Sequence, residues 1–394
     1  EAPAAVVVAD AGPDGFGLRS SDGSFRLRFQ GLAHYDGRAF FDDDADRYVD
    51  GFEIRRVRAD VRGTVYGQYD FRVHLDYAGN RVEVLDAYAE GRFSPAVQVR
   101  VGKFKAPVGL ERLRSASALA FPERAFPTAL APNRDVGLQV QGAVAGQVIN
   151  YAVGVFNGVP DGASGDTDLT DSKDLAGRLV VQPFVGADVA ALRGLSIGVA
   201  ATIGDQRAPV GSPGLPSLRT AIGRNIFLRF RSDGTEAGTV VLDGRRTRIS
   251  PQGSWYWGPF GLVGEYIRST GEVRLGEQND ELTNSAWHLL GSWVLTGEAA
   301  SDRGVSPARS FDPSGGSWGA LEIVGRLHGI STDSPALLAG QSAESASAFA
   351  VGLNWYLNRF VKVQAAYEHT SFGVPQGEEP PAESIFVTRF QFAF

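Results

Sequence analysis

Hydrophobic and polar residues alternate with a period of two along most of the chain, which is the pattern of β-strands with two different faces. In the run 69–77, every second residue is aromatic or aliphatic. The residues between them are Asp70, Arg72, His74 and Asp76. The uncharged segment 136–160 alternates in the same way around an interruption at Gly146 and Gln147, so it predicts two strands joined by a tight turn and not a helix. The pattern as a whole predicts an all-β protein.

A soluble β-sandwich would also alternate, so two further features decide between the architectures. The runs are about ten residues long, which exceeds the usual strand of five or six residues and suits a tilted strand that crosses a membrane. Short turns also alternate with long polar segments, as they do in bacterial outer-membrane barrels. Counting the runs from Ser24 to Phe394 gives sixteen strands, provided that the segment 227–230 belongs to a long loop. We therefore expect a sixteen-stranded transmembrane antiparallel β-barrel over residues 24–394, preceded by a periplasmic N-terminal segment, residues 1–23.

Charge changes this picture because it is unevenly distributed. The 394 residues carry 38 Lys and Arg against 45 Asp and Glu, a net charge of −7. Four predicted outer loops are acidic: 36–51, 158–173, 271–283 and 373–383. The remainder is net basic, including two long loops, 105–135 and 206–244. A lumen lined by arginine forks would favour the passage of anions.

A structural interpretation of the wall arginines stays open beside the functional one. In that interpretation, the arginines pair with acidic residues of the wall and brace the barrel, which would leave little free charge in the lumen. The acidic residues concerned are Asp60, Asp70, Asp76, Asp86 and Glu90. The net basic remainder of the chain favours a modest preference for anions.

Several classes of function are disfavoured by what the chain lacks. It contains no cysteine, which excludes a disulfide framework, a thiolate metal site and a cysteine nucleophile. It contains no Met and begins with Glu1, which favours a mature product whose signal peptide has been removed. The five histidines show no metal-ligand spacing, and Asp42, Asp43, Asp44 and Asp46 are interpreted as a solvated loop tip. We therefore expect no enzyme, no cofactor and no metal site, and the pI near 5.4 argues against a nucleic-acid partner.

A set of motifs occurs in a fixed order along nearly the whole chain. The motifs are Phe52-Glu-Ile-Arg-Arg-Val-Arg, Gly102-Lys-Phe-Lys-Ala-Pro-Val-Gly-Leu-Glu, Phe121-Pro-Glu-Arg, Pro132-Asn-Arg-Asp-Val-Gly, Leu295-Thr-Gly-Glu, Trp318-Gly-Ala-Leu-Glu and Gly352-Leu-Asn-Trp-Tyr-Leu-Asn. Together they resemble the phosphate- and pyrophosphate-selective porins of the porin O and P type. The resemblance implies a homotrimeric, sixteen-stranded outer-membrane barrel. It also implies that the third loop, here 105–135, folds inward and narrows the pore.

The resemblance also implies residues of a pore constriction that binds anions. Arg55 and Arg56, at the start of the second strand, are similar to the constriction of the family, and Asp86 matches its acidic partner. The family completes its phosphate site with a lysine on the third loop, but this position falls near Ser117, and no lysine lies nearby. The basic residues left to supply charge there are Lys105, Arg112 and Arg114. Counterparts of the family's arginine ladder at the pore entrance are Arg219, Arg224, Arg229 and Arg231.

Because adjacent strand residues normally face opposite sides, Arg55 or Arg56 must lie at the rim or on a bulge if both are to reach the pore. For the trimer contacts, we expect strands near the start of the chain, because their outward rows lack the interfacial aromatic residues of a lipid-facing wall. These rows include Val97, Val99, Val101 and Leu138.

We therefore expect a bacterial outer-membrane diffusion channel that passes small anions, including phosphate or polyphosphate. Its surroundings would be outer-membrane lipid and lipopolysaccharide. The alternative within transport is a general porin for small polar or carboxylate nutrients. The alternatives from other classes are an enzyme embedded in a barrel and a structural surface protein.

Overall fold

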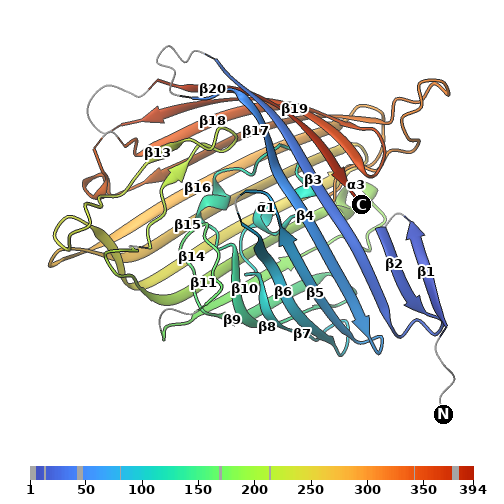
Figure 1. Ribbon diagram of the computed structural model, residues 1–394, viewed down its shortest axis with the longest axis horizontal. Coiled ribbons are helices and arrows are strands. Elements are labelled where there is room, and N and C mark those ends of the chain that lie inside the picture. Colours follow the sequence, from blue (N-terminus) through green and yellow to red (C-terminus); the bar gives the residue numbers. More distant parts are fainter. Residues whose placement is uncertain are drawn as a thin grey trace.

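The computed structural model describes residues 6–12, 15–41, 48–79, 81–167, 171–212, 214–340, 342–374 and 381–394. Over these ranges, one antiparallel sheet of eighteen strands contains a closed barrel of sixteen strands and an N-terminal hairpin of two (Figure 1). The first half of the barrel consists of β3 (Arg26–Phe41), β4 (Gly51–Val65), β5 (Tyr69–Asp76), β6 (Glu83–Arg92), β7 (Gln98–Lys105), β8 (Arg134–Val144), β9 (Ile149–Phe156) and β10 (Asp174–Val181). The second half consists of β11 (Leu195–Arg207), β14 (Val240–Trp257), β15 (Phe260–Leu275), β16 (Gln278–Val294), β17 (Ala320–Thr332), β18 (Ser345–Tyr356), β19 (Val361–Gly373) and β20 (Glu383–Ala393). The predicted sixteen-stranded antiparallel barrel is confirmed.

The barrel closes where the last strand meets the first. β20 pairs with β3 from Ser384 opposite Phe41 to Ala393 opposite Leu32. The terminal Phe394 then exchanges both backbone hydrogen bonds with Gly31, at 3.0 and 3.1 Å. Closure pairs the last strand with the first, so the spanning sheet has no open edge among the described strands.

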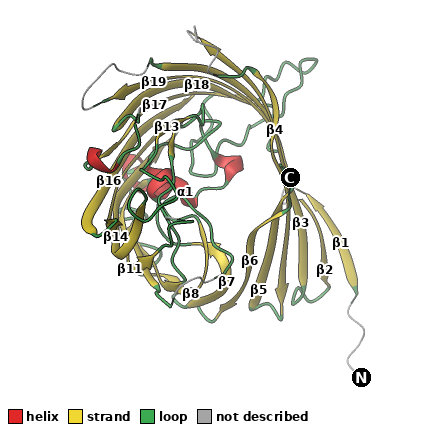
Figure 2. Ribbon diagram, turned by 60° about the vertical axis from the view of Figure 1, so that its left-hand side comes forward, coloured by secondary structure: helices red, strands yellow, loops and turns green. Residues whose placement is uncertain are grey.

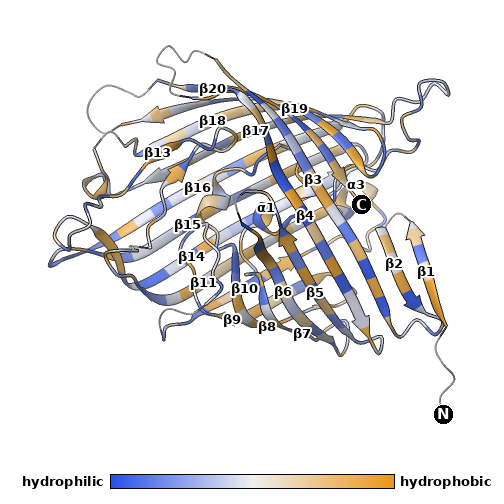
Figure 3. Ribbon diagram, viewed as in Figure 1, coloured by the Kyte–Doolittle hydropathy of each residue, from blue (hydrophilic) through white to orange (hydrophobic). Residues whose placement is uncertain are grey.

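The two faces of the wall follow the alternation in the sequence (Figure 3). Outward residues such as Val73, Leu289 and Trp293 are exposed and apolar, while Asp60, His74 and others of opposite parity are buried in the interior. A wall with lipid outside and polar contacts inside requires this period of two. None of the helices in the described part of the chain is long and apolar enough to cross a membrane.

The N-terminal hairpin is paired with the first part of β3, next to the point where the barrel closes. β1 (Val7–Gly12) pairs with β2 (Gly15–Ser20), and β2 pairs with β3 from Phe16 opposite Phe29 to Arg19 opposite Arg26. β2 thus occupies the same edge of β3 that β20 occupies farther along the strand. A periplasmic location of residues 1–23 stays a prediction.

The connections between strands depart from the sequence prediction in three places. The predicted acidic loop 271–283 is wrong, because β15 and β16 continue as a long hairpin with only residues 276–277 between them. The predicted loop 36–51 begins too early, because β3 extends to Phe41 and Asp36 is buried in the wall. At the end of the barrel where short turns were expected, β16 and β17 are joined by the long segment 295–319. The aspartates Asp42, Asp43, Asp44 and Asp46 lie outside the described residues.

Two long connections fold into the barrel and pack against one side of it (Figure 2). The third loop, residues 106–133 between β7 and β8, carries α1 (Leu110–Leu113), η1 (Ala116–Ala118) and α2 (Pro127–Leu130). The connection between β11 and β14, residues 208–239, carries the small hairpin of β12 (Leu218–Arg219) and β13 (Ile226–Leu228). The remaining helical segments are α3 (Ala190–Arg193) and η2 (Pro335–Leu337).

Apolar side chains hold these two connections against the strands β14 to β20. One cluster joins Phe126 and Leu130 of the third loop to Phe227 of the other connection and to Ile267 and Ile330 of the wall. A second cluster places Phe121 and Ile222 beside Val263, Val324 and other small wall residues. Burial of this apolar surface is favourable by roughly 25 cal/mol per Å². The interior beside β14 to β20 is therefore filled, and open space remains beside β3 to β8.

Candidate functional site: a basic pore constriction

A cavity of about 900 Å³ lies inside the barrel between the third loop, the β12–β13 connection and the wall of β3 to β8. Twelve basic and four acidic side chains line it. The basic ones are Arg55, Arg56, Arg58, Arg62, Arg72, Arg100, Lys105, Arg112, Arg124, Arg134, Arg219 and Arg224, and the acidic ones are Asp60, Asp86, Glu123 and Asp161. The excess of positive charge makes the open part of the lumen attractive to anions.

Arg55 and Arg56 both reach this cavity because β4 bulges between them. Ile54 pairs with Tyr35 of β3 and Arg56 pairs with His34, so Arg55 is an extra residue in the ladder. A bulge turns two successive side chains toward the same side, which an unbroken strand cannot do. Of the two arrangements expected for the adjacent arginines, a place at the rim or on a bulge, the structure has the bulge.

The partner of both arginines is Glu123 of the third loop. Arg55 donates to it through Nε at 2.8 Å and through Nη2 at 3.3 Å, and Arg56 donates through Nη2 at 2.8 Å. Arg389 of β20 donates to the same carboxylate at 2.9 Å and is also held by both oxygens of Asp36 at 2.6 Å. Burial alone would raise the pKa of Glu123, but Arg56, Arg55 and Arg389 lower that pKa well below its ordinary value. Glu123 is therefore charged.

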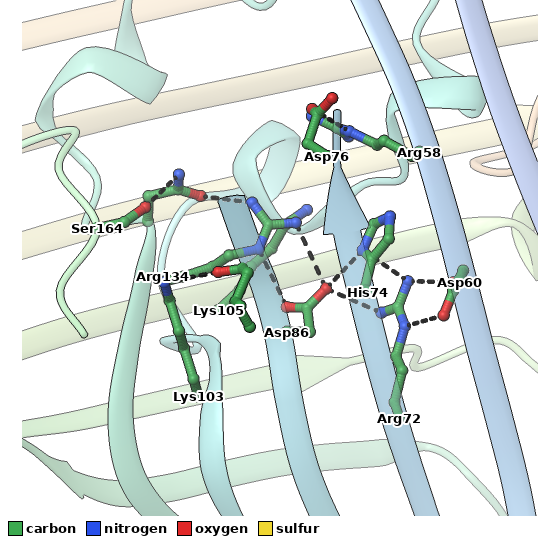
Figure 4. Close-up of polar contacts among 12 residues, drawn as sticks. Arg58, Asp60, Arg72, His74, Asp76, Asp86, Lys103, Lys105, Arg134 and Ser164 are labelled. Carbon is green, nitrogen blue, oxygen red and sulfur yellow. Dashed lines mark hydrogen bonds and ion pairs between the residues drawn. The ribbon is translucent and has the colours of Figure 1, made fainter. Parts of the chain in front are cut away.

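Asp86 has different partners from those expected (Figure 4). It accepts from His74 at 2.8 Å and from Arg134 at 3.1 Å, and it forms an ion pair with Arg72 at 3.3 Å. A second bulge lies beside it, because His74 pairs with Asp86 and Leu75 pairs with Val84. Asp86 thus braces β5, β6 and β8 on the wall opposite the third loop.

The other acidic residues of the structural interpretation pair with arginines in the same way. The pairs are Asp60 with Arg62 and Arg72, Asp70 with Arg92, Asp76 with Arg58, and Glu90 with Arg100. The bracing interpretation is therefore confirmed for these acidic residues. The positive excess comes from the other arginines around the cavity, above all those of the third loop and of the β12–β13 connection.

The basic residues of the third loop region face the cavity with their donors partly engaged. Lys105 lines the cavity, but its ammonium donates to the carbonyl oxygens of Arg112, Leu113 and Arg114 at 2.6, 3.4 and 3.0 Å. These three carbonyls take up the three N–H groups of the ammonium, which therefore has none left to offer an anion. Arg124 donates to the carbonyls of Glu111 and Arg114, at 3.0 and 2.8 Å.

Of the two predicted arginines of the third loop, Arg112 faces the cavity and Arg114 does not. Arg112 lines the cavity and donates to the carbonyl of Thr128, and burial lowers its pKa to about 9, so it remains charged at neutral pH. Arg114 does not line the cavity, because its guanidinium points to the hydroxyl of Tyr256 in β14, at 2.7 Å.

Two of the four arginines predicted for the pore entrance line the cavity, and the other two do not. Arg219 and Arg224 line the cavity, and Arg224 forms an ion pair with Glu53 of β4. Arg229 and Arg231 are exposed and do not line it. Of the four predicted arginines, only those of β12 and of the turn between β12 and β13 therefore line the cavity.

Sequence reasoning missed several residues of the lining. Arg72 and Arg100 share the inward parity of β5 and β7, so the alternation could have found them. Arg124 lies within the third loop and Arg134 directly follows it, where no periodic pattern places them. No local signal ties Glu123 to Arg55 and Arg56, which precede it by 68 and 67 residues.

One short sequence match to a hydrolase motif has no catalytic geometry. Gly315–Gly319 reads Gly-x-Ser-x-Gly, but it lies in the connection 295–319, and Ser317 Oγ donates to the carbonyl of Arg309 at 3.4 Å. A nucleophile elbow requires a strand before the serine and a helix after it, whereas β17 begins directly after Gly319.

A sixteen-stranded barrel with an inward-folded loop and a charged, water-accessible lumen defines an outer-membrane porin. The chain belongs to the family of phosphate-selective porins O and P, whose model matches residues 25–394. Family and fold therefore point to a channel in the bacterial outer membrane rather than to an enzyme.

Relatives and solved structures cover the whole barrel. Porin O of Pseudomonas aeruginosa is 23% identical over 410 residues, which cover 96% of this chain and 91% of that protein. The outer-membrane channel DcaP of Acinetobacter baumannii has a similar fold, with a TM-score of 0.61 at 10% identity over 96% of this chain and 99% of that one. The anion-selective porin of Comamonas acidovorans has a TM-score of 0.55 at 14% identity over 94% of this chain and 100% of that one. At these identities, the solved structures support the fold alone.

Proposed function

We propose that this porin is a diffusion channel for small anions. The observation that carries the proposal is the lining of the open cavity, where basic side chains outnumber acidic ones by twelve to four. Such a field concentrates anions at the narrowest part of the path and repels cations, while leaving room for both to pass. The name of the family, phosphate-selective porins, and that of the anion-selective porin of Comamonas acidovorans agree with this choice of solute.

Phosphate capture in this channel is weak. Tight binding of an oxyanion needs several free donors that converge on it. Here Arg55 and Arg56 are engaged by Glu123, Lys105 donates to three carbonyls, and Ser117 occupies the region where the family has a lysine.

The test is the reversal potential of single channels in a planar bilayer under a gradient of potassium chloride. The sign expected is that of a chloride-preferring pore, and cation preference would contradict the proposed function. Phosphate titrated into the same chamber should reduce the current only at high concentration. Block at sub-millimolar phosphate would contradict weak capture.

We further propose that the channel is a homotrimer whose contacts include the outer faces of β7 and β8. Val101 and Leu138 are exposed there without neighbouring tryptophans, whereas Trp287 and Trp293 are exposed on β16. A face that packs against protein needs no aromatic girdle. A solved barrel of similar fold, OmpT of Vibrio cholerae, is described in a trimer form.

The chain's lack of cysteine allows a clean test of this assembly. Single-cysteine variants Val101→Cys and Leu289→Cys are treated in native membranes with a long-spacer bismaleimide. Cross-linked species are expected for Val101→Cys and not for Leu289→Cys, which lies on the tryptophan-bearing strand β16. Only monomers in both variants would contradict the proposed contacts.

A further inference from the structure

The carboxylate of Glu123 lies where a bound oxyanion would lie. Its Oε1 accepts from Arg55 Nε and Arg389 Nη2, and its Oε2 accepts from Arg56 Nη2, at 2.8, 2.9 and 2.8 Å. Arg55 binds it with two parallel donors, the fork geometry that guanidinium groups use for carboxylates and phosphates. Three guanidinium groups that converge on one anion form a built oxyanion site, and the occupant is a side chain of the same chain.

The occupant is held in place by its backbone and not by its carboxylate alone. The carbonyl of Glu123 accepts from Arg326 of β17 at 2.9 Å, and the carbonyl of Pro122 accepts from Arg389. The preceding residues are fixed as well, because Asn354 donates to the carbonyl of Ala120 at 2.9 Å and Lys362 donates to that of Leu119 at 2.9 Å. Because these contacts use backbone carbonyls, we expect the loop to keep its path when the carboxylate of Glu123 is removed.

We propose that Glu123 is a tethered counterion that occupies an oxyanion site of the constriction and thereby keeps the channel's affinity for phosphate low. This inference rests on the proposed function of an anion channel. The group that would compete for the vacated site is a small oxyanion, such as inorganic phosphate or a simple carboxylate. Free anions then pass beside a filled site and meet only the positive charge that its two carboxylates, Glu123 and Asp36, leave uncompensated.

Charge and occupancy can be separated by two substitutions of the same residue. Glu123→Gln removes the charge but leaves the site filled by a side chain of equal size. Glu123→Ala removes the charge and opens the site, which frees the donors of Arg55 and Arg56. Hydrogen bonds to charged groups are strong enough that each freed guanidinium improves binding by about tenfold or more.

The readout is the phosphate concentration that halves the single-channel chloride current. We expect this concentration to fall by about tenfold or more in Glu123→Ala and by much less in Glu123→Gln. Acetate in the bath should relieve the phosphate block of Glu123→Ala, because a free carboxylate replaces the missing one. The matched control is Asp243→Ala, which removes a carboxylate paired with Arg207 and Arg274 outside the lining of this cavity, and it should leave the half-blocking concentration unchanged.

Several results would overturn the inference. Equal block in Glu123→Ala and Glu123→Gln would mean that only the field of the lumen changed, and unchanged block in Glu123→Ala would mean that the site is not an oxyanion site. If Glu123→Ala does not form a heat-modifiable barrel, Glu123→Ser gives a second test, because it also removes the carboxylate and leaves a side chain too short to fill the site. Phosphate should block Glu123→Ser at lower concentration than Glu123→Gln, and equal block in these two variants would refute the tethered counterion. Cation preference in the unmodified channel would instead refute the proposed function itself.

Discussion

The double substitution Arg55→Ala/Arg56→Ala should weaken or reverse the anion preference of the channel. The two arginines, Arg389, Glu123 and Asp36 form one cluster with a net charge of +1, and the substitution makes that charge −1. At an effective dielectric of about 20, one unit charge acts on an ion about 10 Å away with roughly 1.7 kcal/mol. Screening over a Debye length of about 10 Å at 0.1 M salt reduces this to roughly 0.6 kcal/mol.

Two charges act on anions and cations with opposite signs, so the permeability ratio should change by roughly 2.4 kcal/mol, or about fiftyfold, at 0.1 M salt. At 1 M salt the Debye length is about 3 Å, and the same estimate gives a change of less than about twofold. The salt dependence is therefore a sharper signature than the change at any single concentration.

The assay is the reversal potential in potassium chloride gradients centred on low and on high salt, with the barrel confirmed by heat-modifiable migration on gels. The matched control is Arg303→Ala/Arg309→Ala, which removes two exposed arginines of the connection 295–319, away from the cavity. This control should leave selectivity unchanged at both salt concentrations. An unchanged ratio in Arg55→Ala/Arg56→Ala at 0.1 M, or an equal change at 0.1 M and 1 M, would refute the reasoning.

Three further predictions concern the stability of the barrel, its assembly and the anchoring of the third loop. Asp161→Ala leaves the buried Arg246 and Arg248 without the carboxylate that they share. The substitution should therefore lower the free energy of unfolding by about 3–5 kcal/mol. The temperature at which the folded barrel band disappears from gels should fall accordingly. For comparison, Asp243 forms partly exposed ion pairs with Arg207 and Arg274, so Asp243→Ala should lower the free energy of unfolding by less than about 1 kcal/mol. Deletion of residues 1–15 should leave a heat-modifiable barrel, because β20 and not β2 closes the sheet on β3, and loss of assembly would contradict this. Lys362→Ala should raise open-channel noise, because its ammonium holds the carbonyls of Ser117 and Leu119, and an unchanged noise spectrum would count against that anchor.

The sequence by itself determined the wall of this protein. A strand between lipid and a polar interior must alternate residue by residue, so the alternation alone assigns Asp70, Arg72, His74 and Asp76 to the inward row. The same rule required either a bulge or a place at the rim for Arg55 and Arg56, because no regular strand points two neighbours into one lumen, and the structure has the bulge. It failed at 271–283, because polar residues beyond the membrane can continue a hairpin as readily as they form a loop.

Only the tertiary structure decided how the lumen is charged. The path of the third loop depends on contacts with strands far away in the sequence, such as Lys362 with Ser117 and Arg326 with Glu123. That path places a carboxylate between Arg55 and Arg56 and directs the ammonium of Lys105 into carbonyl oxygens. No local pattern encodes these contacts, because loop residues have no periodicity and their partners are chosen by the packing of the whole barrel interior.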